Sequence, residues 1–437
     1  MNRTKLIIIG IVGGLGVLIL MVVLVLGGLN KTVGTKSATL TFWGTFDDPS
    51  FYRTAIGEFE TANPGIRIVY TQYNFDDYEK KLVDAFASGT GPDIWLMHNT
   101  WLPKHIDQIQ PLPQTILPGE KAPLMTLKDF QEQFVDVTAQ DLTANGQIYA
   151  LPLYTDTLGL YYNKDIFNTA GISAPPKTWD EFNADVRKLS VFDARGNIVK
   201  SAAAIGTSQN VNRSTDILML LMLQSGVQMT DPNNTGATFS HAVNGQNVGE
   251  NALQFYTDFA NPSKQLYTWN SQQHYSIDAF TNGETAMMFN YSHQIATIRS
   301  KAARFNFATA PIPQIAGSPI NINFASYWAP TVAKQSKNGV VAWKFLVYLT
   351  SAKGSVSYIN ASNNPSARRD LIDQQKTDPD LGPFAVQSLS AKSWYQIDNT
   401  AIETIFANMI DDVNFGRASV TDALKAAENK VSVLMSQ

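Results

Sequence analysis

Residues 38–97 have the sequence ATLTFWGTFDDPSFYRTAIGEFETANPGIRIVYTQYNFDDYEKKLVDAFASGTGPDIWLM, and they decide the fold. Runs of β-branched and aromatic residues predict strands, and apolar residues at helical spacing predict helices between them. The expected order is strand 38–43, helix 50–62, strand 66–70, helix 78–87 and strand 93–97. Strands that alternate with helices over so short a stretch are typical of an α/β fold with a largely parallel sheet.

The rest of the chain continues this mixed pattern. Further strands are expected at 148–152, 158–162, 286–289 and 305–310, and further helices at 178–189, 217–223, 248–259, 277–280, 340–349 and 420–434. Thr178 and Glu181 have the spacing of a capping box at the start of the helix 178–189. The chain has 437 residues, 44% of them hydrophobic. This is enough apolar material for two cores, because a single core stops growing at roughly 250–300 residues.

The N-terminus carries the apolar segment LIIIGIVGGLGVLILMVVLVLGGL, which runs from Leu6 to Leu29 without a charge. About 20 apolar residues span a bilayer, whereas a signal peptide has a shorter apolar region followed by a small-residue cleavage site. No such site follows here. We expect a transmembrane anchor with a polar tether over residues 1–36, a cytoplasmic N-terminus and the bulk of the chain outside the cell. Cleavage of the segment is the alternative.

Composition excludes several classes of function. The chain has no cysteine, which excludes disulfides, thiolate metal sites, cysteine nucleophiles and a lipid anchor on cysteine. With 33 basic and 37 acidic residues and no basic block, it lacks the electrostatic footprint of a nucleic-acid binder. No hydrolase, zinc-protease or nucleotide-binding motif is present, and the five histidines never have metal-ligand spacing. We expect no catalysis, no cofactor and no metal, although two distant carboxylates could still meet in the fold.

Loops rich in aromatic, amide and carboxylate residues follow several expected strands. They span residues 43–47, 97–99, 154–156, 290–293 and 326–328. In open α/β sheets, ligands bind beyond the carboxyl ends of the strands. Flat rings beside amides and carboxylates suit a sugar, which has apolar C–H faces and hydroxyl edges. Core packing is the other interpretation of each ring taken alone.

Several segments together resemble a known family. They are LTFWGTFDD at 40–48, EFETANPGIRIVY at 58–70, ASGTGPDIW at 87–95, YYNKD at 161–165, PPKTWDEF at 175–182, AFTNGETAMMFN at 279–290, VAWKFLVYLTS at 341–351 and VTDALKAAENKV at 420–431. In this order they resemble the extracellular solute-binding proteins of ABC importers, in the branch that contains maltose-binding protein.

The resemblance implies a two-lobe periplasmic-binding-protein-like (Venus-flytrap) fold with the ligand in the cleft. Lobe 1 would hold residues 37–155 and 310–362, and lobe 2 residues 156–309 and 363–437. The implied partners are a carbohydrate and the permease subunits of an ABC importer, with the binding protein itself a monomer.

The resemblance also implies ligand-binding residues. Thr45 and Asp47 fall on polar contacts, Asp156 on a cleft carboxylate, and Met97 and His293 on positions where relatives have a stacking tryptophan. Candidates from the same loops and from segments that often reach the cleft are Phe46, His98, Asn99, Tyr154, Tyr291, Trp328 and Arg368.

Met97 and His293 in place of tryptophan argue against a maltodextrin as the ligand, and the helix 6–29 replaces the family's lipid anchor. Two rival hypotheses remain at this point. One is a membrane-anchored carbohydrate-active enzyme; the other is the same fold with a peptide, polyamine or anion as its ligand.

Overall fold

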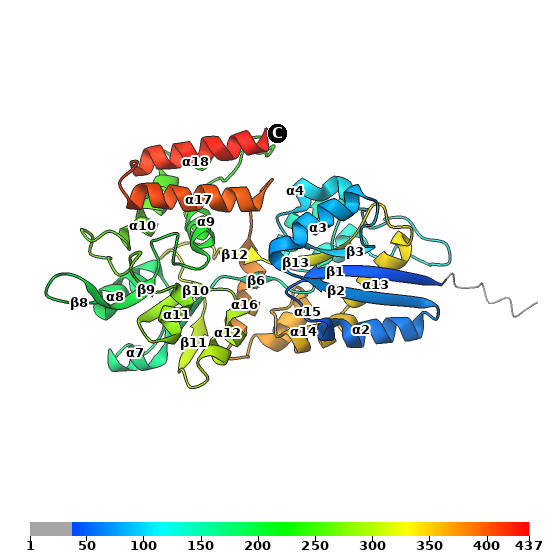
Figure 1. Cartoon of the computed structure of the whole chain (residues 1–437), viewed down its shortest axis with the longest axis horizontal. Coiled ribbons are helices and arrows are strands. Elements are labelled where there is room, and N and C mark those ends of the chain that lie inside the picture. The colour runs from blue at the N-terminus through cyan, green and yellow to red at the C-terminus, as the bar shows by residue number, and fades with distance from the viewer. Residues whose placement is uncertain (1–36, 437) are drawn as a thin grey trace, which may run out of the picture.

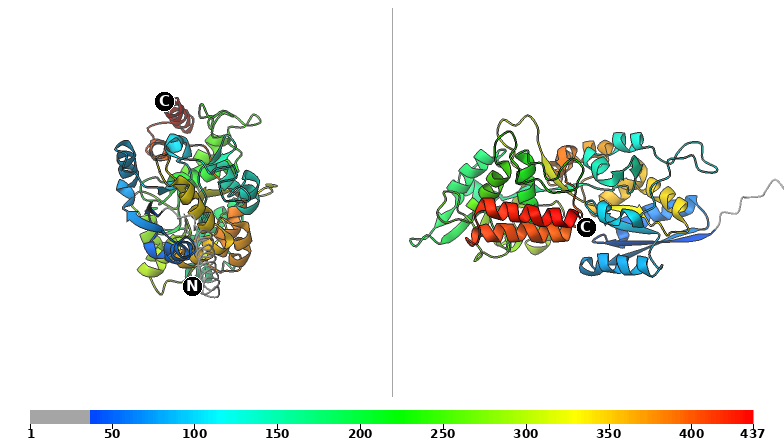
Figure 2. Two further views of the ribbon diagram at one scale, coloured as in Figure 1. Left: turned by 90° about the vertical axis from the view of Figure 1, so that its right-hand side faces the viewer. Right: turned by 90° about the horizontal axis from the view of Figure 1, so that it is seen from above.

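The computed structural model describes residues 37–436, which form two lobes joined by a narrow waist (Figure 1). The expected anchor, Leu6–Leu29, lies outside the described residues. Within residues 37–436, no helix has the length and apolar character that a bilayer-spanning segment requires. Strand β1 begins at the end of lobe 1 that lies farthest from lobe 2, and the views in Figure 2 place the two lobes end to end.

Lobe 1 contains the segment that opened the sequence analysis. Its elements are β1 (Ala38–Thr45), α2 (Pro49–Ala62), β2 (Ile66–Tyr73), α3 (Phe75–Ala87), β3 (Ile94–His98), α4 (Leu102–His105), η1 (Ile106–Gln108), α5 (Leu127–Gln133), α6 (Asp136–Leu142), β4 (Thr143–Ala144), β5 (Gln147–Ile148), β13 (Trp328–Val332), α13 (Gly339–Leu349), α14 (Ala352–Ser362) and α15 (Arg369–Gln375). The predicted order over residues 38–98 is confirmed. The strand predicted at 148–152 is reduced to β5.

The lobe 1 sheet has the order β13-β3-β1-β2. Strand β1 pairs in parallel with both β2 and β3, whereas β13 returns antiparallel beside β3. The carboxyl ends of the three parallel strands therefore lie at one edge, and Figure 1 shows this edge facing lobe 2. The parallel sheet thus delivers the loops after β1, β2 and β3 to the space between the lobes.

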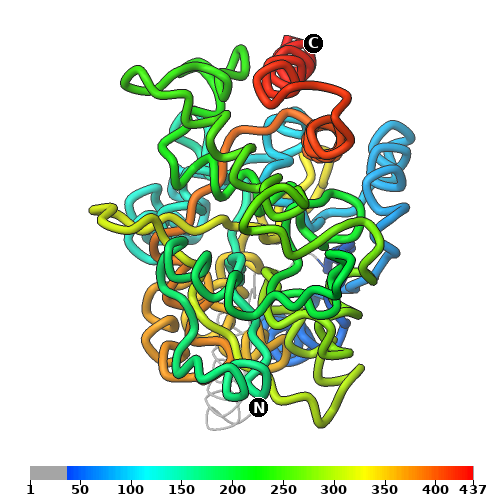
Figure 3. The backbone as a smooth tube through the Cα atoms, turned by 90° about the vertical axis from the view of Figure 1, so that its left-hand side faces the viewer, coloured from blue at the N-terminus to red at the C-terminus, as the bar shows by residue number. Residues whose placement is uncertain are grey.

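Lobe 2 is built from β7 (Gly159–Asn163), α7 (Lys164–Thr169), α8 (Trp179–Leu189), β8 (Val191–Phe192), β9 (Ile198–Ala204), α9 (Ser214–Gln224), α10 (Val248–Asp258), α11 (Ser276–Thr281), β10 (Thr285–Asn290), α12 (Gln294–Lys301), β11 (Phe307–Ala310), α16 (Gly382–Gln387), η2 (Ser388–Ser390), α17 (Asn399–Asn414) and α18 (Val420–Met435). Its sheet has the order β11-β7-β10-β9-β8. Helices α17 and α18 pack side by side on the outer face of the lobe, as Figure 3 shows nearly end-on.

The waist is a three-stranded sheet in which every strand crosses between the lobes. It contains β6 (Asp156–Thr157), β12 (Asn323–Ser326) and β14 (Ala391–Lys392) in the order β14-β12-β6. Ser326 lies opposite Asp156 in the antiparallel pair, and Asn323 lies opposite Ala391 in the parallel pair. The three crossings are therefore hydrogen-bonded to one another and act as a single hinge.

The two hydrophobic cores show where the chain changes lobe. Ala310, Ile312 and Phe324 pack in the core of lobe 2, although the sequence analysis placed residues 310–324 in lobe 1. Ala367 and Ile372 pack in the core of lobe 1, although that analysis assigned them to lobe 2. The chain therefore returns to lobe 1 at β12 and leaves it again only after residue 372. Short extended segments carry no periodicity that marks such a crossing.

A pair of glycine substitutions tests the packing beside the hinge. A Cβ atom on Gly159 would lie 2.4 Å from Cε1 of Phe384, whose ring is fully buried, whereas a Cβ on Gly57 in helix α2 would meet nothing within 4 Å. Overpacking costs about 1–3 kcal/mol, so Gly159→Ala should lower the free energy of unfolding by that amount. Gly57→Ala should raise it by about 0.5–1 kcal/mol, because alanine favours the helix.

Denaturant titration of both variants measures these changes. If Gly159→Ala raised the free energy of unfolding as much as Gly57→Ala does, the ring of Phe384 would have moved aside without cost.

Candidate ligand-binding site

An aromatic cluster occupies the edge of lobe 1 that faces lobe 2. Trp328 begins β13 directly opposite His98, the last residue of β3. Its ring centroid lies 5.4 Å from that of His98, 4.9 Å from that of Trp101 and 6.0 Å from that of Tyr78, each in an edge-to-face arrangement. Trp328 itself is only 8% exposed. The predicted ring is therefore at the cleft edge, but most of its surface supports neighbouring rings.

Two phenylalanines extend this cluster into solvent. Phe46 is 59% exposed and Phe75 is 48% exposed, and their rings stack with centroids 5.0 Å apart. The Phe46 and Phe75 centroids lie 5.8 Å and 6.1 Å from that of Trp328. The sequence analysis identified Phe46 but missed Phe75, which follows β2 as the first residue of α3. A loop search after every strand, including β2, would have found it.

His98 is held in its neutral form. Its Nδ1 lies 2.8 Å from Oγ1 of Thr100, and its Nε2 lies 3.1 Å from Oγ of Ser326 in the hinge. Burial, reinforced by the positive charge of Arg213, lowers the pKa of His98 from 6.5 to about 3. His98 belongs to lobe 1 and Arg213 precedes α9 in lobe 2. Through its contact with Ser326, which pairs with Asp156 in the hinge, His98 lies where lobe 1 meets lobe 2.

Asp47 lies under the aromatic cluster among tyrosine hydroxyls. Tyr52 and Tyr358 both donate hydrogen bonds to Oδ2, the second at 3.0 Å. Tyr70 donates to the backbone carbonyl of Asp47 at 3.0 Å. Burial raises the pKa of the carboxyl from 3.8 to about 6, and the hydrogen bonds from Tyr52 and Tyr358 oppose this rise. Neighbouring Thr45 is also buried, and its Oγ1 has no partner among the described residues.

The opposing face of lobe 2 carries a charged network around Arg213. Nε of Arg213 donates to Oδ2 of the buried Asp216 at 2.8 Å, and Nη2 approaches Oε1 of Glu403 at 3.5 Å. The guanidinium lies over the ring of Tyr291, 5.6 Å from its centroid. The hydroxyl of Tyr291 donates to the same oxygen of Asp216 at 2.6 Å. Tyr291 is therefore buried behind Arg213, which is the more accessible of the two side chains.

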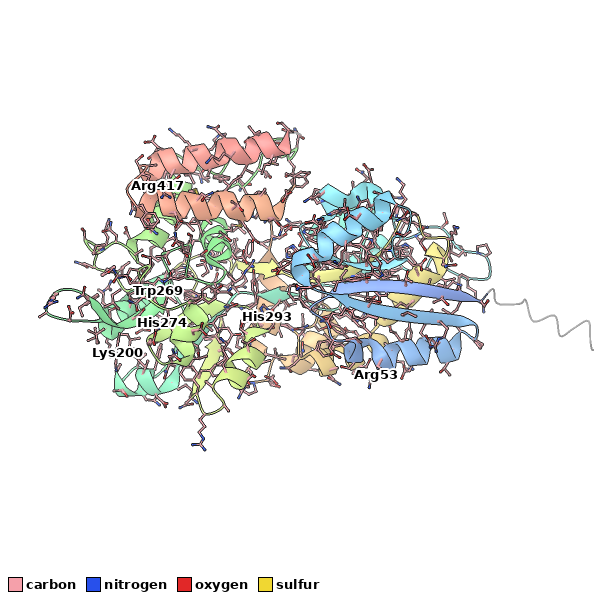
Figure 4. The ribbon with its side chains drawn as sticks, viewed as in Figure 1. Arg53, Lys200, Trp269, His274, His293 and Arg417 are labelled. Atoms are coloured by element: carbon pink, nitrogen blue, oxygen red, sulfur yellow. The ribbon has the colours of Figure 1, made fainter. Side chains whose placement is uncertain are left out.

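His293 is the most exposed candidate in lobe 2, with 55% of its side chain exposed. Its ring stacks on that of Tyr291, with centroids 6.0 Å apart and planes 19° apart. Figure 4 shows His293 where lobe 2 meets the waist. Nδ1 lies 3.7 Å from Oδ2 of Asp156. The carboxylate of Asp156 is buried and accepts hydrogen bonds from Ser292 and Thr157, so Asp156 positions the loop that carries His293.

Direct contacts also join lobe 1 to the start of α17. Nε1 of Trp101 donates to Oδ1 of Asn399 at 2.8 Å, and Nζ of Lys104 lies 2.9 Å from Oδ2 of Asp398. The other oxygen of Asp398 caps α17 by accepting from the backbone of Ala401 at 3.0 Å. These contacts hold α17 close to the cluster and bring Glu403, about one turn along the helix, towards Arg213.

A second region between the lobes is a cavity lined by residues of both lobes. It has a volume of about 610 Å³ and is lined by lobe 1 residues 99–100, 103 and 140–141, lobe 2 residues 223, 226–230, 234, 320 and 322, and the connecting residues 392–396. Asn99 faces this cavity and donates to Oδ2 of Asp141 at 2.9 Å. Tyr154, by contrast, lies on the cluster side, where its hydroxyl accepts from the backbone of Trp328 at 3.3 Å.

Three predicted ligand residues do not reach the cluster side. Met97 is 0% exposed and packs in the core of lobe 1, because alternation along β3 turns it away from His98. Arg368 is buried against Phe134 and pairs with Asp370, so it holds lobe 1 together. Asn99 lines the second cavity. Positions carried over from relatives do not determine which way a side chain points.

Arg213 and Glu403 were missed by the sequence analysis. Arg213 has φ 62° and precedes a helix without a side-chain cap, and no motif surrounds it. Glu403 lies in α17, a helix of 16 residues that the sequence analysis did not predict. Their proximity depends on the packing of α17 against α9, which joins residues nearly 200 positions apart.

The buried carboxyl of Asp47 predicts a specific pH dependence of stability. From about pH 4 to about pH 6, the folded protein keeps a proton on Asp47 that the unfolded chain has lost, so the free energy of unfolding falls as the pH rises. Asp47→Asn removes this titration. Between pH 4 and pH 7 the stability of wild type relative to Asp47→Asn should fall by up to ~3 kcal/mol.

Urea denaturation at intervals across this window measures the difference. Asp48→Asn is the matched control, because Asp48 is exposed and its hydrogen bonds with Ser50 lower its pKa rather than raise it. Asp48→Asn should therefore not reproduce the fall. A constant difference between wild type and Asp47→Asn would show that Asp47 titrates normally.

Comparison with known proteins gives a consistent result. A profile of the family of bacterial extracellular solute-binding proteins matches residues 54–383. A putative binding protein of Brucella abortus is 23% identical over 98% of this chain and 98% of its own length. Maltodextrin-binding protein MdxE of Bacillus subtilis is 25% identical over 79% of this chain and 77% of its own length.

The fold agrees with these matches. The sugar-binding protein MalE from Xanthomonas citri superposes with a TM-score of 0.76 at 20% identity, covering 91% of this chain and 97% of that one. The profile spans most of the described residues and includes the hinge strands β6 and β12, together with the loops that carry His98, Arg213, His293 and Trp328. This chain therefore belongs to the family of bacterial extracellular solute-binding proteins.

Proposed function

We propose that this protein captures a carbohydrate between its lobes and delivers it to the permease of an ABC importer. The observation that carries this proposal is the pairing of two unlike surfaces across the hinge. Lobe 1 offers exposed rings, Phe46 and Phe75, whereas lobe 2 offers the partly exposed charges of Arg213 and Glu403 beside His293. A sugar chain has apolar faces for the first surface and hydroxyls for the second.

The hydrogen-bonding capacity of Arg213 supports a hydroxylated ligand. Its Nε and Nη2 groups are directed to Asp216 and Glu403, which leaves the N–H groups of Nη1 available. The acidic partners hold the guanidinium in place and offset its charge. A neutral ligand with several hydroxyls fits this balanced network better than an anion, which would have to displace Glu403.

Relatives bind ligands of this class. Solved structures at TM-scores of 0.67–0.74 hold α-D-tagatose in a Thermotoga lettingae protein, maltotetraose in a cyclo/maltodextrin-binding protein and mannotriose in a third protein. They differ in sugar and in length. They support a carbohydrate in this chain without pointing to a particular one, and the histidine at position 293, where relatives have a stacking tryptophan, argues against a maltodextrin.

We propose that binding closes the hinge. A ligand shifts the balance between open and closed forms only through its different affinity for them, and such a difference arises when both lobes contact it. We assign residues 37–155 and 325–375 to lobe 1 and residues 156–324 and 382–437 to lobe 2, with strand β14 of the second group lying in the waist. The closed, loaded monomer would then dock on the permease without catalytic turnover of the sugar.

Substitution of the accessible site residues tests the placement of the ligand. His293→Ala should weaken binding of the tightest sugar found in a glycan screen by about tenfold or more, since an interface contact of this kind contributes roughly 1–2 kcal/mol. The melting temperature should not change, because His293 is exposed. Isothermal titration calorimetry measures affinity, and small-angle scattering measures the compaction that accompanies closure.

The matched control is Tyr395→Ala, which alters the second space between the lobes and leaves the aromatic cluster intact. Normal binding by this variant is expected. Loss of binding in Tyr395→Ala together with normal binding in His293→Ala would place the sugar in the second cavity. Cleavage of the bound oligosaccharide would favour the rival hypothesis of a carbohydrate-active enzyme.

We also propose that residues 1–36 anchor the protein to the cell membrane, with both lobes on the extracellular side. The 24 uncharged residues from Leu6 to Leu29 match the bilayer core in length. N-terminal sequencing of protein extracted from membranes should recover Met1 or Asn2. A mature N-terminus near residue 30 would instead identify the segment as a cleaved signal peptide.

A further inference from the structure

The stacked pair Phe46–Phe75 differs from most aromatic residues in this protein because both of its rings are largely exposed. Phe46 stands between Thr45 and Asp47, which are both buried. Its backbone is left-handed, with φ 63°. A non-glycine residue in this region is strained and persists where the surroundings impose it. Here the bend leaves an apolar ring in water between two buried polar residues.

The bend is held by several contacts of Asp47. The backbone N–H of Asp47 donates to the carbonyl of Thr45 at 2.7 Å, across Phe46. The Asp47 carboxylate and carbonyl are held by the tyrosine hydroxyls described above. The backbone of Phe46 is therefore held by buried structure, and its ring is held by contacts with Phe75 and Trp328. A ring fixed in this way loses little conformational freedom when a ligand stacks on it.

The pair is also continuous with the candidate site. Both rings contact Trp328, and Trp328 contacts His98, whose Nε2 lies 3.1 Å from Oγ of Ser326, the residue paired with Asp156 in the hinge. A series of rings therefore leads from the centre of the cleft to the exposed pair. A ligand held at the hinge beside His98 would have to extend past Trp328 to reach Phe46 and Phe75.

The charges beside the pair specify the class of ligand further. Asp76 and Asp77 follow Phe75 in the first turn of α3 and are exposed. Asp77 has Lys81 at 3.5 Å, and both side chains of this pair are largely solvated. Carboxylates accept hydrogen bonds from hydroxyl groups and repel anions. The surroundings favour a neutral sugar unit over a uronic acid or a sulfated one.

We propose that Phe46 and Phe75 form an outer stacking subsite that selects neutral oligosaccharides over shorter sugars. This inference rests on the proposed carbohydrate function and adds a length preference to it. The inner part of the cleft binds one end of the chain, and the exposed pair stacks on a unit farther along. Short sugars fill only the inner part and gain nothing from the pair.

Binding across length series tests the subsite. The probes are neutral gluco- and manno-oligosaccharides, α- and β-linked, from the monosaccharide to the pentasaccharide, titrated into wild type and variants by calorimetry. Phe46→Asn suits the left-handed backbone, and Phe75→Ser suits the start of a helix. For wild type, affinity should rise once the chain is long enough to reach the pair. Each variant should remove about three- to tenfold of that rise and leave the shorter sugars unaffected.

Phe192→Ser is the matched control. Phe192 in β8 is 42% exposed and stacks on Tyr267 with centroids 5.8 Å apart, so it is also an exposed stacked ring. It lies in lobe 2 at the end far from lobe 1 (Figure 1). Its removal should change the affinity for no member of the series. The melting temperature of each variant, measured without sugar, separates lost contacts from lost folding.

The possible outcomes are distinct. Equal weakening of short and long sugars by Phe46→Asn and Phe75→Ser would place the pair in the inner site and overturn the subsite. Unchanged affinity for every length would also overturn it. Failure of wild type to bind any carbohydrate would overturn the proposed function itself, together with the inference that rests on it.

Discussion

The pairing of Ser326 with Asp156 in the hinge sheet is the constraint on which the rest of the site depends. On the lobe 1 side, the hydroxyl of Ser326 lies 3.1 Å from Nε2 of His98. On the lobe 2 side, the carboxylate of Asp156 accepts from both the backbone and the hydroxyl of Ser292, next to His293. One backbone pair thus positions both binding surfaces at the ends nearest the hinge. Rotation about the hinge changes the distance between the outer parts of the two surfaces, whereas the ends nearest the hinge stay together.

Asp47 illustrates how the site combines rigidity with a cost in stability. A carboxyl buried among tyrosines has a raised pKa, since the low-dielectric surroundings oppose its charge. The hydroxyls of Tyr52 and Tyr358 lessen this cost, and the same contacts hold the strained turn at Phe46. Exposed rings need such support, because they gain no stability from burial. Local strain and a poorly solvated charge are typical of positions shaped by binding rather than by folding.

The aromatic cluster with the Arg213 network and the 610 Å³ cavity differ in what they offer a ligand. The aromatic cluster and the Arg213 network bring stacking surfaces and free donors together, whereas the 610 Å³ cavity has its carboxylate, Asp141, already engaged by Asn99 and Tyr327. Residues 392–399 run from the hinge strand β14 to α17. This segment lines the 610 Å³ cavity at residues 392–396 and contacts Trp101 of the aromatic cluster at Asn399. A movement of this segment would therefore change both the cavity and the aromatic cluster. This geometry couples the site to the position of α17.

The sequence alone determined the local elements and the class of fold. Strands and helices over residues 38–98 followed from periodicity, because each pattern reports which face of its own element is buried. The motifs from LTFWGTFDD to VTDALKAAENKV determined the family, and several candidate residues, including Phe46, His98 and His293, were found from their places after strands. Helix α17 was missed even though it has 16 residues.

The direction of each side chain and the meeting of distant residues were decided only by the tertiary structure. Met97 and His98 are neighbours in sequence, yet alternation along β3 and its pairing with β13 bury one and direct the other to the cleft. Arg213 and Glu403 meet because α17 packs on α9, and Phe75 joins Phe46 because β1 and β2 end at the same edge of a parallel sheet. Periodicity reports burial within one element, whereas a binding site requires contacts between elements, and these depend on packing across the whole chain.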